Sequence, residues 1–134
     1  MPTIFSRIIA GEIPCHKVAE DEKCLAFLDI QPVVFGHTLV IPKLEIDYYF
    51  DLDDDYISHL NIFAKKVAKV LNEEIECLRI GVMIAGLEVP HAHIHLIPIN
   101  SIRDLSFTNP RLKIPEAEMA ALAEKLSSSF SKSV

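Results

Sequence analysis

Three of the six histidines fall at alternate positions within five residues: His91, His93 and His95. Alternate side chains of a β-strand lie on one face, so a strand over residues 91–99 would place these three imidazoles side by side. The apolar residues between them, at positions 92, 94 and 96, would then point to the opposite face and into the core. A core disfavours three adjacent imidazoles because every ring nitrogen needs a hydrogen-bond partner. The spacing therefore favours a functional site.

Two kinds of chemistry suit such a row. Neutral imidazole is a common zinc ligand, but alternate strand positions usually supply two ligands of a site, and nothing in the sequence marks the others. Alternatively, a neutral imidazole has a free lone pair that can attack phosphorus. A neighbouring imidazole could then protonate the leaving group, and another could bind the phosphoryl oxygens. On the residues alone, both metal-dependent hydrolysis and nucleophilic catalysis stay open.

The other chemically active side chains give weaker signals. His16 and His59 are expected on the surface, whereas His37, which follows Gly36 at the start of a strand, fits a surface and a site position equally well. The three cysteines are far apart and form no C-x-x-C pair, which argues against a disulfide framework or a thiolate zinc site. We expect Cys24, in an apolar stretch, to be a core or strand residue and not a nucleophile.

Composition limits the class of protein. The chain has 134 residues, half of them apolar, and no apolar run approaches the roughly 20 residues that span a bilayer. The net charge of −6 disfavours nucleic-acid binding, which needs a dense basic face, so the charge of an anionic ligand would have to be met locally. The N-terminal residues lack the features of a signal peptide. We therefore expect one cytoplasmic domain over residues 1–134 that binds neither nucleic acid nor membranes.

Hydrophobic periodicity and turn residues predict the order of helices and strands. Helices are expected at residues 4–10, 53–76 and about 115–130, with a tail at 127–134 that frays. Strands are expected at residues 16–20, 23–29, 38–41, 79–84 and 91–99. The acidic run at 51–55 fits the start of the long helix better than a metal site. Short hairpins with helices between them indicate an α+β fold with a mostly antiparallel sheet.

The stretch from Pro90 to Pro98 resembles the signature of the histidine triad nucleotide-binding family, H-x-H-x-H followed by apolar residues. Residues 4–14, and residues 26–32 followed by 36–43, resemble other parts of the same family in the family's order. The resemblance covers roughly residues 3–99 and is nearest to the Hint-like branch. It implies a HIT-like α+β fold with a five-stranded, mostly antiparallel sheet, and a homodimer in which the sheet is continuous across two copies.

The resemblance also implies an activity and a set of site residues. Members hydrolyse or transfer a nucleoside monophosphate, typically AMP, from phosphoramidates or acyl-adenylates through a nucleotidyl-histidine intermediate and without a cofactor. By position, His93 would be the nucleophile and His95 would contact the α-phosphate and help the leaving group, while His91 and His37 would support them. Asp29 would hold the ribose hydroxyls of a purine nucleotide. Apolar residues would wall the base, although each also fits an ordinary core: Ile4, Phe5, Ile8, Phe27 and Ile30.

Departures from the family pattern affect these expectations. Many bacterial members bind structural zinc with a C-x-x-C near the start and a histidine after I-P-K, but those positions hold Thr3, Ser6 and Glu45 here, so we expect no zinc. The loop before the triad is shorter than usual and lacks an asparagine, and Leu87 replaces a glutamine. Glu88 in the same loop is also expected among the nucleotide-binding residues, although it would repel a phosphate if its side chain pointed inward.

The family usually has an arginine where this chain has Ile99. Because this arginine and the loop amides are missing, three hypotheses stay open. The first is a nucleotidyl hydrolase or phosphoramidase that uses His93. The second is a nucleotide-binding or regulatory protein with little turnover, and the third is a metal-dependent hydrolase built on the histidine row. Apolar walls would accept adenine and guanine alike.

Overall fold

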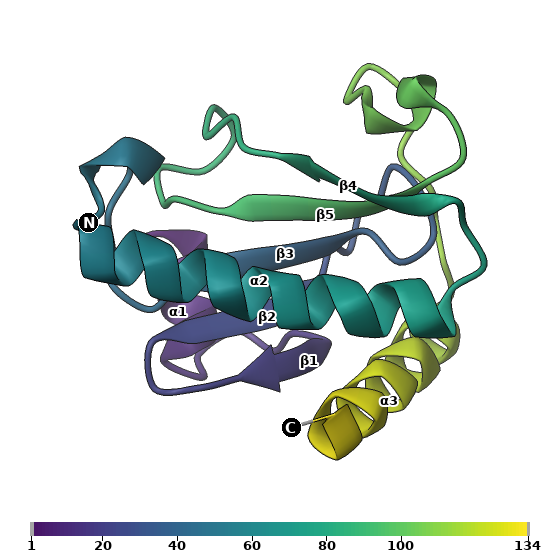
Figure 1. Cartoon of the computed structure of the whole chain (residues 1–134), viewed down its shortest axis with the longest axis horizontal. Helices are drawn as coiled ribbons and strands as arrows, with labels where there is room; N and C mark the ends of the chain where they lie inside the picture. Colours follow the sequence, from purple (N-terminus) through teal and green to yellow (C-terminus); the bar gives the residue numbers. More distant parts are fainter. Residues whose placement is uncertain (1, 134) are drawn as a thin grey trace.

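The structure is a computed structural model that describes residues 2–133. The helices in this range are α1 (Ile4–Ile9), α2 (Asp54–Glu74) and α3 (Glu116–Ser133). The strands are β1 (Lys17–Glu20), β2 (Cys24–Leu28), β3 (Thr38–Pro42), β4 (Arg79–Met83) and β5 (Ile94–Ile99) (Figure 1). Two short 3-10 helices lie in the connections: η1 (Tyr49–Asp51) and η2 (Ile102–Leu105).

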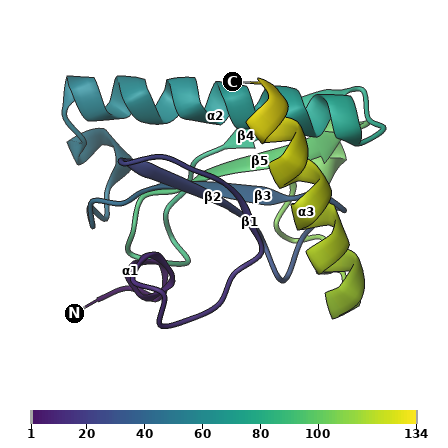
Figure 2. The same cartoon turned by 90° about the horizontal axis from the view of Figure 1, so that it is seen from below.

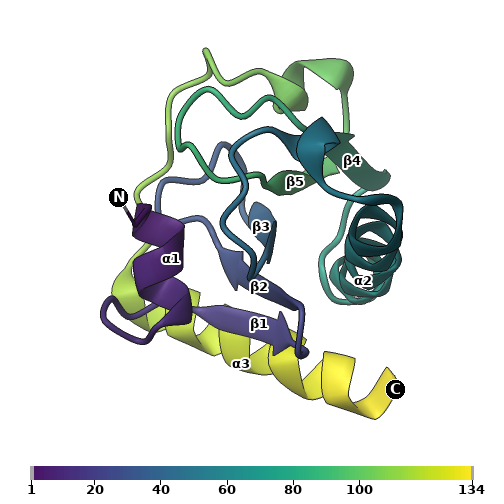
Figure 3. The same cartoon turned by 90° about the vertical axis from the view of Figure 1, so that its left-hand side faces the viewer.

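The strands form one antiparallel sheet in the order β1-β2-β3-β5-β4. α2 runs along one face of this sheet and α1 lies against the other, so the sheet is the middle layer (Figures 2 and 3). α3 packs against α2 and against β1. This is the α+β fold with a five-stranded antiparallel sheet that the sequence predicts. No helix within residues 2–133 combines the length and the apolar character needed to cross a bilayer.

Both faces of the sheet are buried. On the α2 face, Val40, Ile94 and Leu96 of the strands pack with the apolar stripe of the helix. Tyr56 of that stripe is half-buried and its other members are buried: Leu60, Phe63, Val67, Val70 and Leu71. On the α1 face, Phe5 packs on a second apolar cluster from β2 and β3. Because β2 and β3 are buried on both faces, their sequences are nearly continuous apolar runs without polar alternation.

The acidic run before α2 caps the helix, as predicted. A carboxylate oxygen of Asp53 accepts a hydrogen bond from the backbone N–H of Tyr56 at 2.7 Å. Asp54 and Asp55 lie in the first turn, where the positive end of the helix dipole favours acids. These carboxylates therefore stabilise the start of α2.

β5 begins three residues later than predicted, at Ile94. The backbone N–H of His91 donates to the carbonyl of Val89 at 2.8 Å, and that of Ala92 donates to the carbonyl of Ile46 at 2.7 Å. The first part of the histidine row is thus tied to the loop that follows β3 instead of to the β3 ladder. Alternation does not indicate this boundary, because the side chains at 92, 94 and 96 still point into the core as predicted.

The serine-rich tail that was predicted to fray is helical as far as Ser133, and position 134 lies outside the described residues. The ring of Phe130 lies 5.9 Å from that of Phe63 in α2 and packs on the main core. Phe130 continues the apolar face formed by Met119, Leu122 and Leu126. The prediction was wrong because one aromatic anchor outweighs the low helix propensity of the serines.

Candidate active site

The histidine row lies on the α1 face of the sheet. His91, His93 and His95 are all buried, at 3% exposure or less. The ring centroids of His93 and His95 are 4.8 Å apart. Phe5 of α1 meets the rings of His91 and His93 edge-on at 5.7 and 5.2 Å. The three imidazoles therefore lie together as predicted, and their burial means that their hydrogen-bond partners decide what each ring can do.

His91 is satisfied on both sides by the protein. Its Nε2 lies 2.8 Å from the carbonyl oxygen of Pro42, and its Nδ1 lies 2.9 Å from the hydroxyl of Thr3. A carbonyl only accepts, so these partners assign the proton to Nε2 and leave Nδ1 to accept from the hydroxyl. Burial lowers the pKa of this ring. His91 is therefore held neutral and in one orientation, without a free nitrogen for substrate.

Thr3 and Ser6, with Glu45, surround this end of the row. Thr3 caps α1 by accepting the N–H of Ser6 at 2.9 Å, its own N–H donates to Glu45 at 3.3 Å, and the Ser6 hydroxyl also donates to Glu45. These are the positions at which the family resemblance places zinc ligands in many bacterial members. Hydroxyls and one carboxylate, already bonded to one another, lack the thiolate and imidazole donors that structural zinc prefers. The residues present do not fit a zinc site.

His93 has one nitrogen anchored and one free. Its Nδ1 lies 2.6 Å from the carbonyl oxygen of His91, which assigns the proton to Nδ1 and the lone pair to Nε2. Within residues 2–133, every fully buried side-chain nitrogen or oxygen has a hydrogen-bond partner. Nε2 of His93 has no hydrogen-bond partner and therefore cannot be fully buried. It is the ring nitrogen through which His93 reaches the pocket that it lines. A neutral imidazole held in this way presents a nucleophilic lone pair.

A chain of hydrogen bonds fixes the proton on His95. The backbone N–H of Val33 donates to Nδ1 of His37 at 3.1 Å, and Nε2 of His37 lies 2.9 Å from Nδ1 of His95. The proton of His37 is thereby assigned to Nε2, and that of His95 also to Nε2, which faces the pocket as a donor. Burial lowers the pKa of His37 to about 4 and that of His95 to about 3. Both rings are neutral near pH 7.

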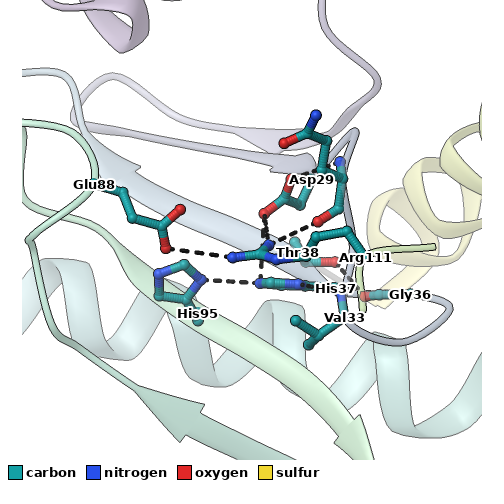
Figure 4. A network of polar contacts seen from close by, with 9 residues as sticks. Asp29, Val33, Gly36, His37, Thr38, Glu88, His95 and Arg111 are labelled. Atoms are coloured by element: carbon teal, nitrogen blue, oxygen red, sulfur yellow. Dashed lines mark hydrogen bonds and ion pairs between the residues drawn. The ribbon is translucent and has the colours of Figure 1, made fainter. Parts of the chain in front are cut away.

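Asp29 follows β2 and lies behind this pair (Figure 4). One carboxylate oxygen accepts the N–H of Gln31 at 2.8 Å, and the other lies 3.7 Å from Nε2 of His37 and 3.8 Å from Nη1 of Arg111. Burial raises the pKa of this carboxyl group, although the Gln31 N–H and the Arg111 guanidinium oppose the shift. Its second oxygen has no partner within 3.5 Å, so it is available to accept hydrogen bonds from a ligand.

A pocket of about 330 Å³ opens on His93 and His95. The loop before the triad lines one side, including Leu87 and Glu88, and the segment between η2 and α3 lines the other. Three larger cavities, of about 500, 650 and 760 Å³, are lined in part by residues of α2 or α3 and include none of the predicted site residues. A neighbouring pocket of about 280 Å³ is lined by His93 but not by His95. Because the 330 Å³ pocket is lined by both histidines, we take it as the site.

Phe107 and Arg111 line this pocket but are not among the predicted site residues. The ring of Phe107 stacks on that of His37 at 5.9 Å and meets that of His95 edge-on at 4.6 Å. The guanidinium of Arg111 lies 5.1 Å from the Phe107 ring, and its Nη2 lies 3.5 Å from Glu88. Both residues follow the segment that resembles the family, and no motif marks them, so only the tertiary structure indicates their place.

The predicted base-walling residues divide into two groups. Phe5 and Phe27 are buried, with rings 5.6 Å apart, and Ile8 is half-buried against the same cluster. Ile4 is 50% exposed and Ile30 is 74% exposed. None of these five side chains lines the pocket of His93 and His95, although Phe5 touches the His93 ring. The exposed pair is therefore free to contact a ligand, whereas the buried pair supports the site from behind.

The other histidines are less exposed than predicted. His16 is paired with Glu116 at 3.3 Å and His59 with Asp21 at 2.7 Å, and both imidazoles are partly buried. Cys24 lies beside the second pair, buried in β2 as expected. Burial raises the pKa of its thiol to about 12, so it stays protonated and is no nucleophile.

A metal site on the histidine row has little support in the geometry. Two clusters of ligand-type side chains occur among residues 2–133, one at Asp21 and His59 and one that joins Asp29, His37 and His95. Neither includes the whole row. Nε2 of His91 and Nδ1 of His93 both face backbone carbonyls, so the three rings do not turn their lone pairs toward one point. The hydrogen bonds suit nucleophilic catalysis better than metal binding.

Comparison with known proteins agrees with this geometry. A HIT domain family model matches residues 10–102. A Schizosaccharomyces pombe protein named adenosine 5'-monophosphoramidase is 39% identical over 130 residues, which cover 96% of this chain and 98% of that protein. The structure of a HIT-like protein from Bartonella henselae has a TM-score of 0.81 at 30% identity and covers 95% of both chains. A zinc-bound histidine triad protein from Mycobacterium smegmatis has the same TM-score at 26% identity, over 96% of this chain and 93% of its own. The chain belongs to the HIT domain family.

Proposed function

We propose that this protein releases a nucleoside monophosphate, in the first place AMP, from phosphoramidate or acyl-adenylate substrates through a nucleotidyl-His93 intermediate. The observation that carries the proposal is the pair of free nitrogens in the pocket. Nε2 of His93 presents a lone pair, and Nε2 of His95 presents an N–H beside it. The phosphoramidase name of the S. pombe relative supports the same choice of substrate.

In this mechanism, His93 Nε2 attacks the α-phosphorus and forms a nitrogen–phosphorus bond while the bond to the leaving group breaks. The His91 carbonyl, 2.6 Å from Nδ1–H, stabilises the positive charge that develops on the ring. His95 hydrogen-bonds through its Nε2–H to a phosphoryl oxygen or to the leaving atom. A leaving amine takes its proton from water, and the proton released in the next step neutralises the hydroxide so formed, whereas the carboxylate of an acyl-adenylate leaves as the anion. Water then attacks phosphorus, releases AMP and restores the lone pair on His93.

The remaining predicted residues support these steps. Asp29 would accept hydrogen bonds from the ribose hydroxyls with the oxygen that has no close partner. His37 keeps the proton of His95 on the pocket side, and His91 supplies the carbonyl that fixes His93. In our proposal these two histidines act through their neighbours and position them, since each of their ring nitrogens already has a partner in the protein.

The test is release of AMP from an adenosine phosphoramidate by wild type and by the variant His93→Ala. We expect the variant to lose roughly three orders of magnitude or more in rate. His16→Ala serves as the control because His16 contacts Glu116 at 3.3 Å, outside the pocket. Rapid quenching of wild type with denaturant at alkaline pH, where a nitrogen–phosphorus bond to imidazole is stable, should trap protein that carries one AMP group, detected by mass spectrometry. Equal release by wild type and the His93 variant would refute the mechanism.

A second candidate is nucleotide binding with little turnover. Leu87 stands where the family resemblance leads us to expect a glutamine. It has no amide to offer and is 92% exposed, and the Glu88 carboxylate lies at the pocket. A site without those amides would bind nucleotide but stabilise the transition state less. This candidate predicts that AMP binds to wild type while AMP release stays at the level of the His93→Ala variant.

We also propose that two copies pair through β4 to give a continuous sheet. β4 is at the end of the strand order, so one side of its backbone has no strand partner among the described residues. Val82 on β4 is 57% exposed, Phe50 of η1 is 71% exposed and Leu87 is 92% exposed. An unpaired edge with exposed apolar side chains favours pairing with a second strand. Sedimentation should give a dimer for wild type and a monomer for Val82→Lys; monomeric wild type at micromolar concentration contradicts this proposal.

A further inference from the structure

We propose that Arg111 binds the phosphate of the nucleotide and takes over the role of the donors that the loop before the triad lacks. This proposal rests on the proposed function, since it assumes that a nucleotide occupies the pocket of His93 and His95. Arg111 belongs to the segment that runs from η2 to α3, outside the part of the chain that the HIT domain model matches. It therefore adds a phosphate-binding residue to the site from a different part of the chain.

The segment that carries Arg111 is fastened to the site at several points. The backbone N–H of Leu112 donates to the carbonyl of Pro32 at 2.8 Å. The guanidinium of Arg111 donates from Nη1 to the carbonyl of Gln31 at 2.7 Å and lies over the ring of Phe107. One nitrogen and one face of the guanidinium are thus used for anchoring. Another nitrogen, Nη2, is turned toward the Glu88 carboxylate at 3.5 Å, as Figure 4 shows. This longer contact leaves that side of the guanidinium for a ligand.

Charge gives the second argument. Arg111 is the one lysine or arginine among the residues that line the pocket, within the described part of the chain. His95 and His37 do not supply positive charge near pH 7, because burial lowers the pKa of both rings, and the nearby guanidinium lowers them further. A phosphate group in this pocket would meet the carboxylate of Glu88 as well. Without Arg111 the anion would face no compensating cation.

The two carboxylate partners of Arg111 are ones that a nucleotide can replace, whereas the hydrogen bond to the Gln31 carbonyl stays in place. Its nitrogens lie 3.8 Å from Asp29 and 3.5 Å from Glu88, both longer than a normal charge-assisted hydrogen bond. When ribose hydroxyls occupy the Asp29 carboxylate, the guanidinium loses only a weak contact. Its planar array of donors suits two phosphate oxygens at once, which a lysine cannot reproduce. We infer that Arg111 turns from the two carboxylates to the phosphate as the nucleotide binds.

The test compares the affinity for AMP with that for adenosine, measured by titration calorimetry on the full chain. Arg111→Gln should weaken AMP binding by roughly ten- to one hundredfold, the usual effect of losing a hydrogen bond to a charged group, and leave adenosine binding within about twofold. Arg111→Lys should keep part of the AMP affinity. Arg103→Gln is the matched control, because Arg103 is an exposed residue of η2 in the same segment and does not line the pocket.

Each other outcome overturns the proposal. An equal loss for AMP and adenosine means that Arg111 only holds the segment in place, and unchanged AMP affinity means that it does not touch the phosphate. Wild type that binds AMP no better than adenosine shows that no phosphate donor exists in the pocket. Thermal unfolding of the variants identifies a loss that comes from misfolding. Because AMP and adenosine undergo no turnover, these results are separate from the hydrolysis assay that tests the proposed function.

Discussion

The two ends of the histidine row are held in different ways. At the His91 end both ring nitrogens are used by the protein, one by the Thr3 hydroxyl and one by the Pro42 carbonyl. At the His95 end one nitrogen is bonded to His37 and the other is left at the pocket. Histidine therefore has a positioning role at the His91 end and a chemical role at the His95 end. Fixing the first end keeps the carbonyl of His91 beneath His93, and this leaves the second end free for chemistry.

The largest effect should come from the free end. His95→Ala removes the N–H donor beside His93, and loss of one such donor typically costs about 10²–10³-fold in rate. We expect that loss in AMP release from an adenosine phosphoramidate, with His95→Gln recovering part of it because its amide keeps a donor. Thermal unfolding should show both variants folded. A His95→Ala variant with the rate of wild type would mean that the two ends do not differ in function.

At the His91 end we expect the opposite result, a loss of stability with little change in rate. Thr3→Val removes the cap of α1 and leaves Nδ1 of the buried His91 without a partner. Together these losses should lower the free energy of unfolding by about 2 kcal/mol. Thr3→Ser keeps the hydroxyl and is the matched control. Urea denaturation measures the change, and the AMP release rate of the folded variant should stay within about twofold of wild type. A large loss of rate without loss of stability would contradict this prediction, because the Thr3 hydroxyl would then act on His93 and not on the stability of the fold.

The fixed end also marks what sequence can and cannot predict. Thr3, Ser6 and Glu45 already indicate that zinc ligands are missing, because the residue types decide that. Their replacement by a hydrogen-bond network with His91 depends on side chains 88 residues apart, so only the folded chain reveals it. Likewise, alternation predicts which face the histidines share. It does not predict that the strand starts at Ile94, since that boundary depends on a backbone bond from Ala92 to Ile46.

At the free end the sequence is less informative. His37, His95 and Asp29 lie in motifs that the family resemblance covers, and the structure brings them within 4.8 Å of one another. Phe107 and Arg111 lie in a connection without periodicity or motif. They reach the pocket because η2 and α3 place the segment against the Gln31–Pro32 loop. Sequence patterns describe contacts along one element well, and they say little about a loop that folds back over a site.

A smaller effect should appear in the pH dependence of stability. The folded pKa of His37 is about 4 and that of His95 about 3, both below the ordinary value of 6.5, so between these values the unfolded chain binds more protons than the folded one. The stability that the neutral pair contributes is fully present above about pH 6.5 and is lost as the pH falls toward 4 and 3. His37→Gln removes one of the two rings but keeps a donor to His95. Urea unfolding between pH 7 and pH 4.5 should therefore show a shallower loss for this variant, with His16→Ala unchanged; identical slopes would mean that the His37 ring is not held neutral.

The smallest effect should come from Glu88, in the loop that borders the pocket at the His95 end. Glu88 repels a phosphate and also attracts Arg111, whose Nη2 lies 3.5 Å away. Glu88→Gln removes both effects, so AMP should bind a few-fold more tightly while adenosine binding stays the same. Because Glu88 is half-exposed, salt screens its charge, and the gain should shrink between about 20 and 300 mM salt. Glu124→Gln, an exposed substitution on α3, controls for net charge. Unchanged or weaker AMP binding in the Glu88 variant would show that the loop leaves the phosphate region untouched, and the His95 end would then depend on Arg111 alone for its charge.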